Sequence, residues 1–147
     1  MTDQTRTDLI QAAAAARMRA YAPYSDFTVG AALLTADGTV ITGCNVENRV
    51  YPAGMCAERS ALFAAVSQGQ RMFRAITVCG GRRAAPAVPD CLPCGQCLQA
   101  LCEFCSADFE IVVALDEDVY DVYRLSDLLP RRFDGVMPPA SRCSGFC

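Results

Sequence analysis

Three cysteines and one glutamate have the residue types and the spacing of a metal site with an acid–base group beside it. Cys94 and Cys97 are separated by two residues in "PCGQC", and "CAERSALFAAVSQG" begins with Cys56 and continues with Glu58. Zinc prefers tetrahedral sites of Cys or His, and a catalytic zinc keeps three protein ligands and an open fourth position for water. The cysteine pair can reach one metal from a turn that enters a helix, and Cys56 can supply a third ligand from the start of another helix.

The position of Glu58 restricts where such a metal could lie. Two residues on an ideal helix are rotated by roughly 200°, so Cys56 and Glu58 would lie on opposite flanks. They converge only if the metal sits beyond the helix end, where Glu58 could take the proton of a zinc-bound water and later deliver it to a leaving group. Arg59, one helical turn after Cys56, and the two helix N-termini would help offset the negative charge of the thiolates.

The absence of histidine narrows the possible chemistry. The sequence contains no histidine, which excludes Ser-His and Cys-His nucleophile pairs and any proton transfer by an imidazole. Proton transfer near neutral pH must then use a carboxylate, a thiol or a metal-bound water.

Other uses of the cysteines stay open at this point. Cys91 could be a fourth ligand, which would make the zinc structural and the protein a non-catalytic binding module. The series that continues to Cys105 could suggest an iron–sulfur site, but the spacing after its third cysteine does not fit the bacterial ferredoxin pattern. Three further cysteines are expected to be small core residues: Cys44, Cys79 and Cys102.

Composition indicates one folded domain. The chain has 147 residues, 52% of them hydrophobic and 20% charged, with a formal net charge of −3. This charge gives no basic footprint for a nucleic acid polymer or an anionic membrane. No run reaches the roughly 18 to 20 apolar residues of a membrane-spanning helix, and the N-terminus lacks an apolar secretory stretch. We therefore expect a soluble, cytoplasmic protein, and in that reducing compartment clustered cysteines favour metal over disulfides.

The elements that would position these residues follow from local patterns. A helix is predicted from Asp3 to about Ala20, and "TVGAALLTADGTVITGCNV" predicts two strands that turn at "ADG". After the loop "NRVYPAGM", a helix is predicted over 56–68, ending at Gly69. "FRAITVCG" predicts a buried strand, 95–105 a helix, "FEIVVALD" and "VYDVYRL" two more strands, and "SDLLP" a short helical turn. The order α-β-β-α-β-α-β-β-α predicts one mixed sheet with helices on both faces.

Four segments together resemble the cytidine deaminase family, in its short single-domain form with three cysteine ligands. These are "YAPYSDFTVGAALL", "GCNVEN", "CAE" and "PCGQC", and the resemblance runs from about Tyr21 to Phe133. It implies an α/β fold, a three-layer α-β-α sandwich with a mixed five-stranded sheet, and a homotetramer whose sites are shared between subunits. The catalytic domain would span 1–136, and the tail 137–147, rich in Pro, Gly and Ser, would be loosely ordered.

The resemblance also implies a role for each matching residue. Cys56, Cys94 and Cys97 would bind one zinc per chain, with Glu58 as the proton shuttle and Arg59 tuning the zinc charge. Residues of the substrate site would be Phe27 on the pyrimidine, Asn45 and Glu47 on the ribose hydroxyls, the backbone around Ala57 and Pro93 at the base edge, and Tyr51 and Phe133 reaching a neighbouring subunit's site.

The implied reaction is hydrolytic deamination of cytidine and 2'-deoxycytidine to uridine and 2'-deoxyuridine with release of ammonia, a step of pyrimidine salvage. Glu47 favours a nucleoside over a free base, because that carboxylate would otherwise be desolvated without a partner. A related zinc deaminase acting on a modified or different aminated nucleoside or base is the alternative.

Several positions depart from the family pattern. Leu98 stands where many members have Arg, so a second positive charge near the zinc is lost, and Gln96 replaces a small residue. Arg49 and Val50 also stand where small residues are usual. Arg49 could reshape the pocket or favour a nucleotide, but a solvent-facing side chain is the more ordinary outcome. The tail cysteines Cys143 and Cys147 have no functional assignment.

Overall fold

The computed structural model describes residues 1–135, and its elements follow the predicted order. They are α1 (Asp3–Arg17), β1 (Phe27–Thr35), β2 (Val40–Cys44), the 3-10 helix η1 (Tyr51–Ala53), α2 (Ala57–Ser67), β3 (Phe73–Arg82), α3 (Gly95–Cys102), β4 (Glu110–Ala114), β5 (Tyr120–Arg124) and α4 (Leu125–Leu128). The predicted tail 137–147 lies outside the described residues.

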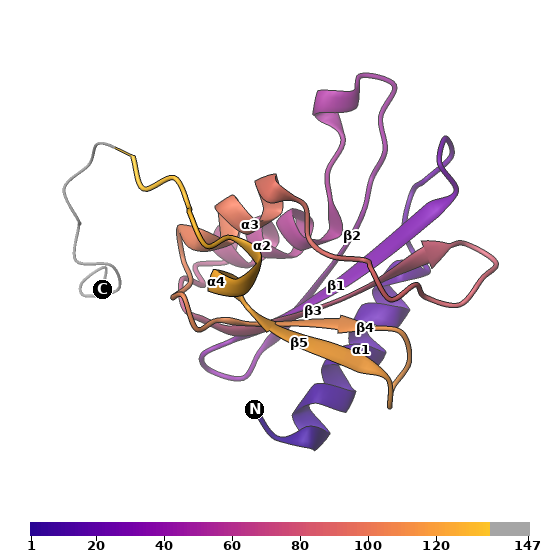
Figure 1. Ribbon diagram of the computed structural model, residues 1–147. Helices are drawn as coiled ribbons and strands as arrows, with labels where there is room; N and C mark the ends of the chain where they lie inside the picture. Colours follow the sequence, from indigo (N-terminus) through magenta and orange to yellow (C-terminus); the bar gives the residue numbers. More distant parts are fainter. Residues whose placement is uncertain (136–147) are drawn as a thin grey trace.

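The five strands form one mixed sheet in the order β2-β1-β3-β4-β5. Strand β1 is antiparallel to β2 and β3, β3 is parallel to β4, and β4 is antiparallel to β5. A parallel pair requires a crossover, which the segment containing α3 provides. Helix α1 covers one face, whereas α2, α3 and α4 lie on the other (Figure 1). This arrangement confirms the predicted three-layer α-β-α sandwich.

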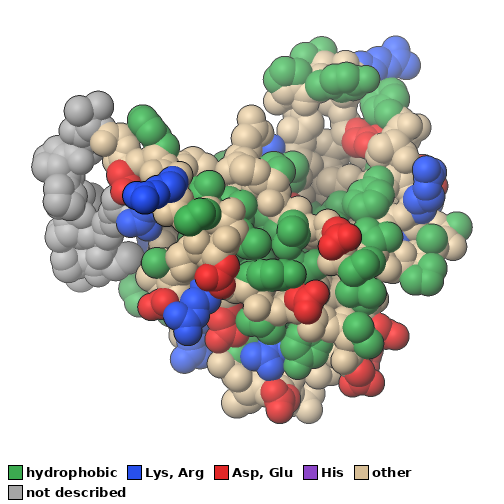
Figure 2. All heavy atoms as spheres, in the orientation of Figure 1, with side chains coloured by type: hydrophobic (Ala, Val, Ile, Leu, Met, Phe, Trp, Pro, Cys, Tyr) green, Lys and Arg blue, Asp and Glu red, His purple; other side chains and the backbone are tan. Residues whose placement is uncertain are grey.

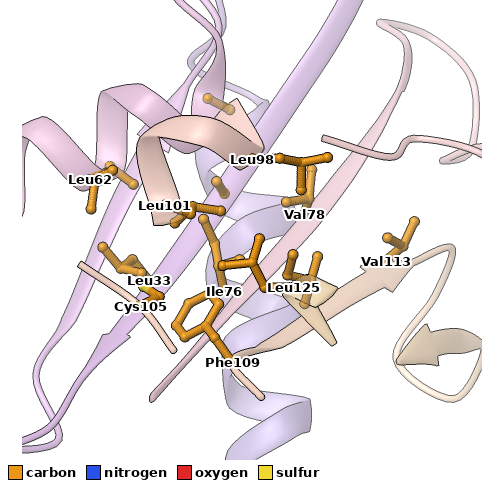
Figure 3. Close-up of a cluster of buried hydrophobic side chains, with 14 of the residues drawn as sticks. Leu33, Leu62, Ile76, Val78, Leu98, Leu101, Cys105, Phe109, Val113 and Leu125 are labelled. Atoms are coloured by element: carbon orange, nitrogen blue, oxygen red, sulfur yellow. The ribbon is translucent and has the colours of Figure 1, made fainter. Parts of the chain in front are cut away.

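The alternation of strand side chains divides the core between the two faces. Along β1, Ala31 and Leu33 belong to the cluster under α2, α3 and α4, while Ala32 and Leu34 belong to the cluster under α1. Figure 3 shows the larger cluster, where leucines from α2 and α3 meet side chains of the central strands. The two clusters hold the sheet between its helices.

Glycine allows α2 to lie close to the sheet. A Cβ atom on Gly43 of β2 would collide with the carbonyl oxygen of Ala57 and the backbone nitrogen of Ala61. The first turn of α2, which follows Cys56, is therefore positioned by direct backbone contact with β2.

Two helices end earlier than predicted, and in both the residues that follow form turns closed by hydrogen bonds back to the helix. Helix α1 ends at Arg17 rather than about Ala20, since the chain must reach Tyr21, whose N–H donates to the carbonyl of Asn45 at 3.0 Å. Helix α3 ends at Cys102 rather than 105, and the segment that follows accepts hydrogen bonds from the start of α4.

Charged side chains of both signs are spread over the face shown in Figure 2. Over residues 1–135, no helix has the length and apolar character required to cross a membrane.

Candidate metal centre and active-site cleft

A cleft of about 840 Å³ opens on the face of the sheet that carries α2 and α3. Its walls come from three stretches that are far apart in the sequence, within 24–29, 45–59 and 90–96. The stretch with η1 projects from the body of the molecule, beside the loop between α1 and β1 (Figure 1). Both lie above the N-termini of α2 and α3, so the cleft joins the predicted substrate residues to the predicted metal ligands.

Three sulfur atoms meet in this cleft. The Sγ atoms of Cys56, Cys94 and Cys97 all lie within 4.8 Å of one another, with 3.9 Å between Cys56 and Cys94 and 3.5 Å between Cys94 and Cys97. A tetrahedral zinc with Zn–S bonds of about 2.3 Å requires S···S distances of about 3.8 Å, so the donor set fits zinc. Within residues 1–135, this metal-binding group consists of these three thiols, which leaves a fourth position for water.

The two helices present their N-termini to the sulfurs. Cys56 and Cys94 are the N-cap residues of α2 and α3, with extended backbones (φ −77°, ψ 155° and φ −69°, ψ 162°), and neither side chain caps its helix. Cys97 lies in the first turn of α3. The partial positive charge of both helix ends therefore favours thiolates. Because Cys56 precedes the helix, it and Glu58 share one side of the helix end, as the sequence geometry requires.

A hydrogen bond and a nearby positive charge favour the thiolate form of Cys56, which is the form that binds a metal. The Cys97 thiol donates to Cys56 and the Arg59 guanidinium lies 3.8 Å from the Cys56 sulfur, and together they lower the Cys56 pKa to about 5. The same shared proton and burial raise the pKa of Cys97. The two thiols therefore share a proton, which a bound cation would displace.

Glu58 is buried beside the three sulfurs. Its exposed fraction is 5%, and burial, followed by the nearby Cys56 charge, raises its pKa. A carboxyl group with a raised pKa accepts and returns protons closer to neutral pH than an exposed glutamate does. Glu58 is therefore suited to move a proton at this site.

Cys91 does not join the metal group. It is buried in the larger core cluster, where burial and the neighbouring Glu58 charge raise the pKa of its thiol to about 12. The four-cysteine structural site considered above is therefore not formed. Leu98 is likewise part of this core, at 5% exposure. The leucine that stands where many family members have arginine therefore packs in the interior.

Most of the predicted substrate residues line the cleft: Phe27, Asn45, Glu47, Tyr51 and Ala57. Asn45 is fixed to β1, because its Oδ1 accepts from the N–H of Val29 at 2.8 Å and its Nδ2 donates to the Phe27 carbonyl at 2.9 Å. Phe133 does not line this chain's cleft. Its side chain is 76% exposed, and its backbone exchanges hydrogen bonds of 3.0 and 2.8 Å with Gln99.

Two residues of the cleft have contacts that the sequence did not predict. Tyr24 and Ser25 donate hydrogen bonds to Glu47, which lies more than twenty positions later in the chain. The motif "YSDF" marks a turn, but nothing local indicates its partner. Arg49 is exposed, and its Nε donates to the Tyr24 hydroxyl at 3.3 Å.

This chain combines a mixed α/β sandwich with three thiols and a buried carboxylate at two helix N-termini. Such an arrangement is typical of the class of zinc-dependent deaminases. Residues 3–114 match the family model described as the cytidine and deoxycytidylate deaminase zinc-binding region, and the chain belongs to this family.

Several cytidine deaminases are similar to this chain in sequence over most of its length. The cytidine deaminase of Halalkalibacterium halodurans is 45% identical over 130 residues, which cover 87% of this chain and 93% of that protein. The cytidine deaminase of Sporosarcina psychrophila is 41% identical over 125 residues, 85% and 88% of the two chains. The crystal structure of cytidine deaminase from Burkholderia pseudomallei has a TM-score of 0.77 and 46% identity, covering 90% of this chain and 100% of that one.

Proposed function

We propose that this protein catalyses the hydrolytic deamination of cytidine and 2'-deoxycytidine to uridine and 2'-deoxyuridine with release of ammonia. The observation that carries the proposal is the buried Glu58 carboxyl beside three clustered thiols at the base of a cleft. The family of the chain and the names of its relatives support the same reaction.

Cys56, Cys94 and Cys97 would hold one zinc per chain. When bound, zinc supplies a Lewis acid that lowers the pKa of a coordinated water. Glu58 accepts a proton from the attacking water as the C4–O bond forms and delivers it to ring N3. It then carries the second proton to the exocyclic amine as the C4–N bond breaks, so cytidine and water become uridine and ammonia. Arg59 balances part of the thiolate charge throughout.

The other cleft residues would bind and orient the nucleoside. Phe27 packs on the pyrimidine, the backbone at Ala57 reads the base edge, and Asn45 and Glu47 bind the ribose hydroxyls. The rigid attachment of Asn45 to β1 supports this role, because a fixed partner orients the substrate at little entropic cost.

The proposal includes a homotetrameric assembly and a cytoplasmic location. Phe133 lies outside this chain's cleft with 76% exposure, and Tyr51, which lines the cleft, is 84% exposed. These large exposed side chains support a homotetramer in which Phe133, and Tyr51 from beside its own cleft, contact a neighbouring site. A role in cytoplasmic pyrimidine salvage fits a cleft that accepts nucleosides.

The test is ultraviolet absorbance of the wild type and of Glu58→Gln during incubation with cytidine and 2'-deoxycytidine, with zinc counted in the same samples. The wild type should convert both substrates, and Glu58→Gln should lose about 10²- to 10⁴-fold in kcat while keeping its zinc. Glu103→Gln, an exposed carboxylate at the end of α3, is the matched control and should retain full activity. No conversion by fully zinc-loaded wild type would refute this substrate assignment.

A further inference from the structure

The Ser25 hydroxyl connects two residues of the proposed nucleoside site. Its Oγ accepts a hydrogen bond from the backbone N–H of Phe27 at 3.0 Å and donates to Oε1 of Glu47. A hydroxyl has one proton, and an ionised carboxylate only accepts. The direction of both hydrogen bonds is therefore fixed, and Ser25 ties the sugar-side carboxylate to the start of β1.

The second oxygen of Glu47 is held by the same turn. Its Oε2 accepts from the backbone N–H groups of Tyr24 at 2.8 Å and of Ser25 at 3.3 Å. The Ser25 hydroxyl and the Tyr24 N–H lower the Glu47 pKa, so the carboxylate is ionised and its plane is set. Each carboxylate oxygen has two lone pairs. Oε1 thus keeps one for a further donor, such as a substrate hydroxyl, while Oε2 is saturated by the backbone.

The turn that presents Ser25 is itself fastened to the body of the protein. Asp26, between Ser25 and Phe27, has φ 58°, the one positive φ of a non-glycine residue within 1–135. Its N–H donates to the carbonyl of Ala22 at 3.2 Å, and its carbonyl accepts from the N–H of Arg83 at 3.0 Å. Such left-handed conformations persist where their surroundings enforce them, and they concentrate at binding sites.

We infer that Ser25 is a positioning residue for sugar recognition: its hydroxyl orients Glu47 to accept a hydroxyl of the nucleoside. This inference rests on the proposed function, and it adds a determinant of selectivity for substrates that carry free sugar hydroxyls. Without Ser25, the two backbone N–H groups still hold Oε2, but Oε1 is free to swing away from the substrate.

The experiment compares cytidine with 2',3'-dideoxycytidine, which lacks both ribose hydroxyls on the ring. For Ser25→Ala, KM for cytidine should rise about tenfold with kcat nearly unchanged. This is the size expected when the hydrogen bond from a sugar hydroxyl to the charged Glu47 carboxylate is lost. The kcat/KM for dideoxycytidine should stay within about twofold of the wild-type value. Ser25→Thr, which keeps the hydroxyl, should restore most of the affinity for cytidine. Ser67→Ala, which removes an exposed hydroxyl at the end of α2, is the matched control and should change neither substrate.

Binding without turnover supplies a second readout. In zinc-loaded Glu58→Gln, added Ser25→Ala should weaken the calorimetric Kd for cytidine about tenfold and leave that for dideoxycytidine unchanged. Equal losses for both nucleosides, or no loss for cytidine, would overturn the inference while leaving the proposed function intact. If the wild type converts neither nucleoside, the proposed function fails and the inference fails with it.

Discussion

The thiol of Cys91 is three positions before Cys94 in the sequence but lies in the core beside Glu58. Separation along the chain therefore does not decide ligation. The sulfurs that meet are those at the starts of α2 and α3, where the helix N-termini favour a thiolate, whereas Cys91 precedes α3 and packs in the core cluster.

Replacing Cys91 tests this distinction. Cys91→Ala should keep about one zinc per chain and lose about 1 kcal/mol of unfolding free energy, because it leaves only a small cavity in the core. Zinc content is measured for both variants after incubation with a competing chelator. Cys97→Ala, which removes one of the three clustered sulfurs, should lose its zinc under these conditions. Zinc loss from Cys91→Ala of the same size as that from Cys97→Ala would make Cys91 a ligand and contradict the three-thiol site.

At the scale of elements, α2 carries Glu58 and follows Cys56, and β2 sets the position of its first turn. Backbone contact at Gly43 leaves no room for a side chain, while Gly38, in the turn from β1 to β2, has φ 92° and open space around its Cα. The two glycines of one hairpin are thus needed for different reasons, close approach at Gly43 and backbone conformation at Gly38.

This difference predicts two separable effects. Gly43→Ala should displace the start of α2, lowering the unfolding free energy by about 1–3 kcal/mol and reducing both zinc content and kcat/KM. Gly38→Ala should cost about 1–2 kcal/mol through the left-handed backbone alone and leave the zinc content unchanged. Urea denaturation and metal analysis of the two variants measure both effects. Full zinc and activity in Gly43→Ala would show that α2 does not depend on this contact.

The elements and the cluster of three cysteines were accessible from the sequence, because helix starts, turns and cysteine spacing are local signals. Cys56 at the helix start and the "ADG" hairpin are such cases. The predicted ends of α1 and α3 were wrong by about three residues, since the final helical residues give way to turns that the local sequence does not distinguish from another helical turn. The bonds from Tyr24 and Ser25 to Glu47 depend on the loop after α1 and the segment after β2 meeting in space, and no local pattern encodes that.

At the scale of the whole molecule, strand order unites the site. The sequence predicted a mixed sheet but not its order, β2-β1-β3-β4-β5. With β1 antiparallel to both β2 and β3 and lying between them, the stretches that precede β1, follow β2 and follow β3 come together at one end of these strands. The cleft is therefore a property of the complete fold, and conditions that weaken the sheet should also weaken the site.

Acid is one such condition, and Asp37 in the β1–β2 turn is a group through which it acts. The Asp37 carboxylate accepts hydrogen bonds from the Thr35 hydroxyl, from the Thr39 N–H at 3.0 Å and from Gln70, also at 3.0 Å, which holds its pKa well below the usual range. The unfolded chain, with an Asp pKa of about 3.9, then binds the proton more readily than the folded one. The contribution of Asp37 to stability is therefore present above about pH 3.9 and is lost as the pH falls further below that value.

Urea denaturation at pH 7, 5, 4 and 3 should show this loss. Asp37→Asn should be less stable than the wild type at pH 7, and the difference should close towards pH 3, because the variant has no carboxylate to protonate there. Asp118→Asn, at an exposed position in the β4–β5 turn, should follow the wild-type curve. Zinc release in acid affects all three proteins alike, so the comparison isolates Asp37. A difference between Asp37→Asn and the wild type that stays constant from pH 7 to 3 would show that the hydrogen bonds of this turn do not depend on the charge of Asp37.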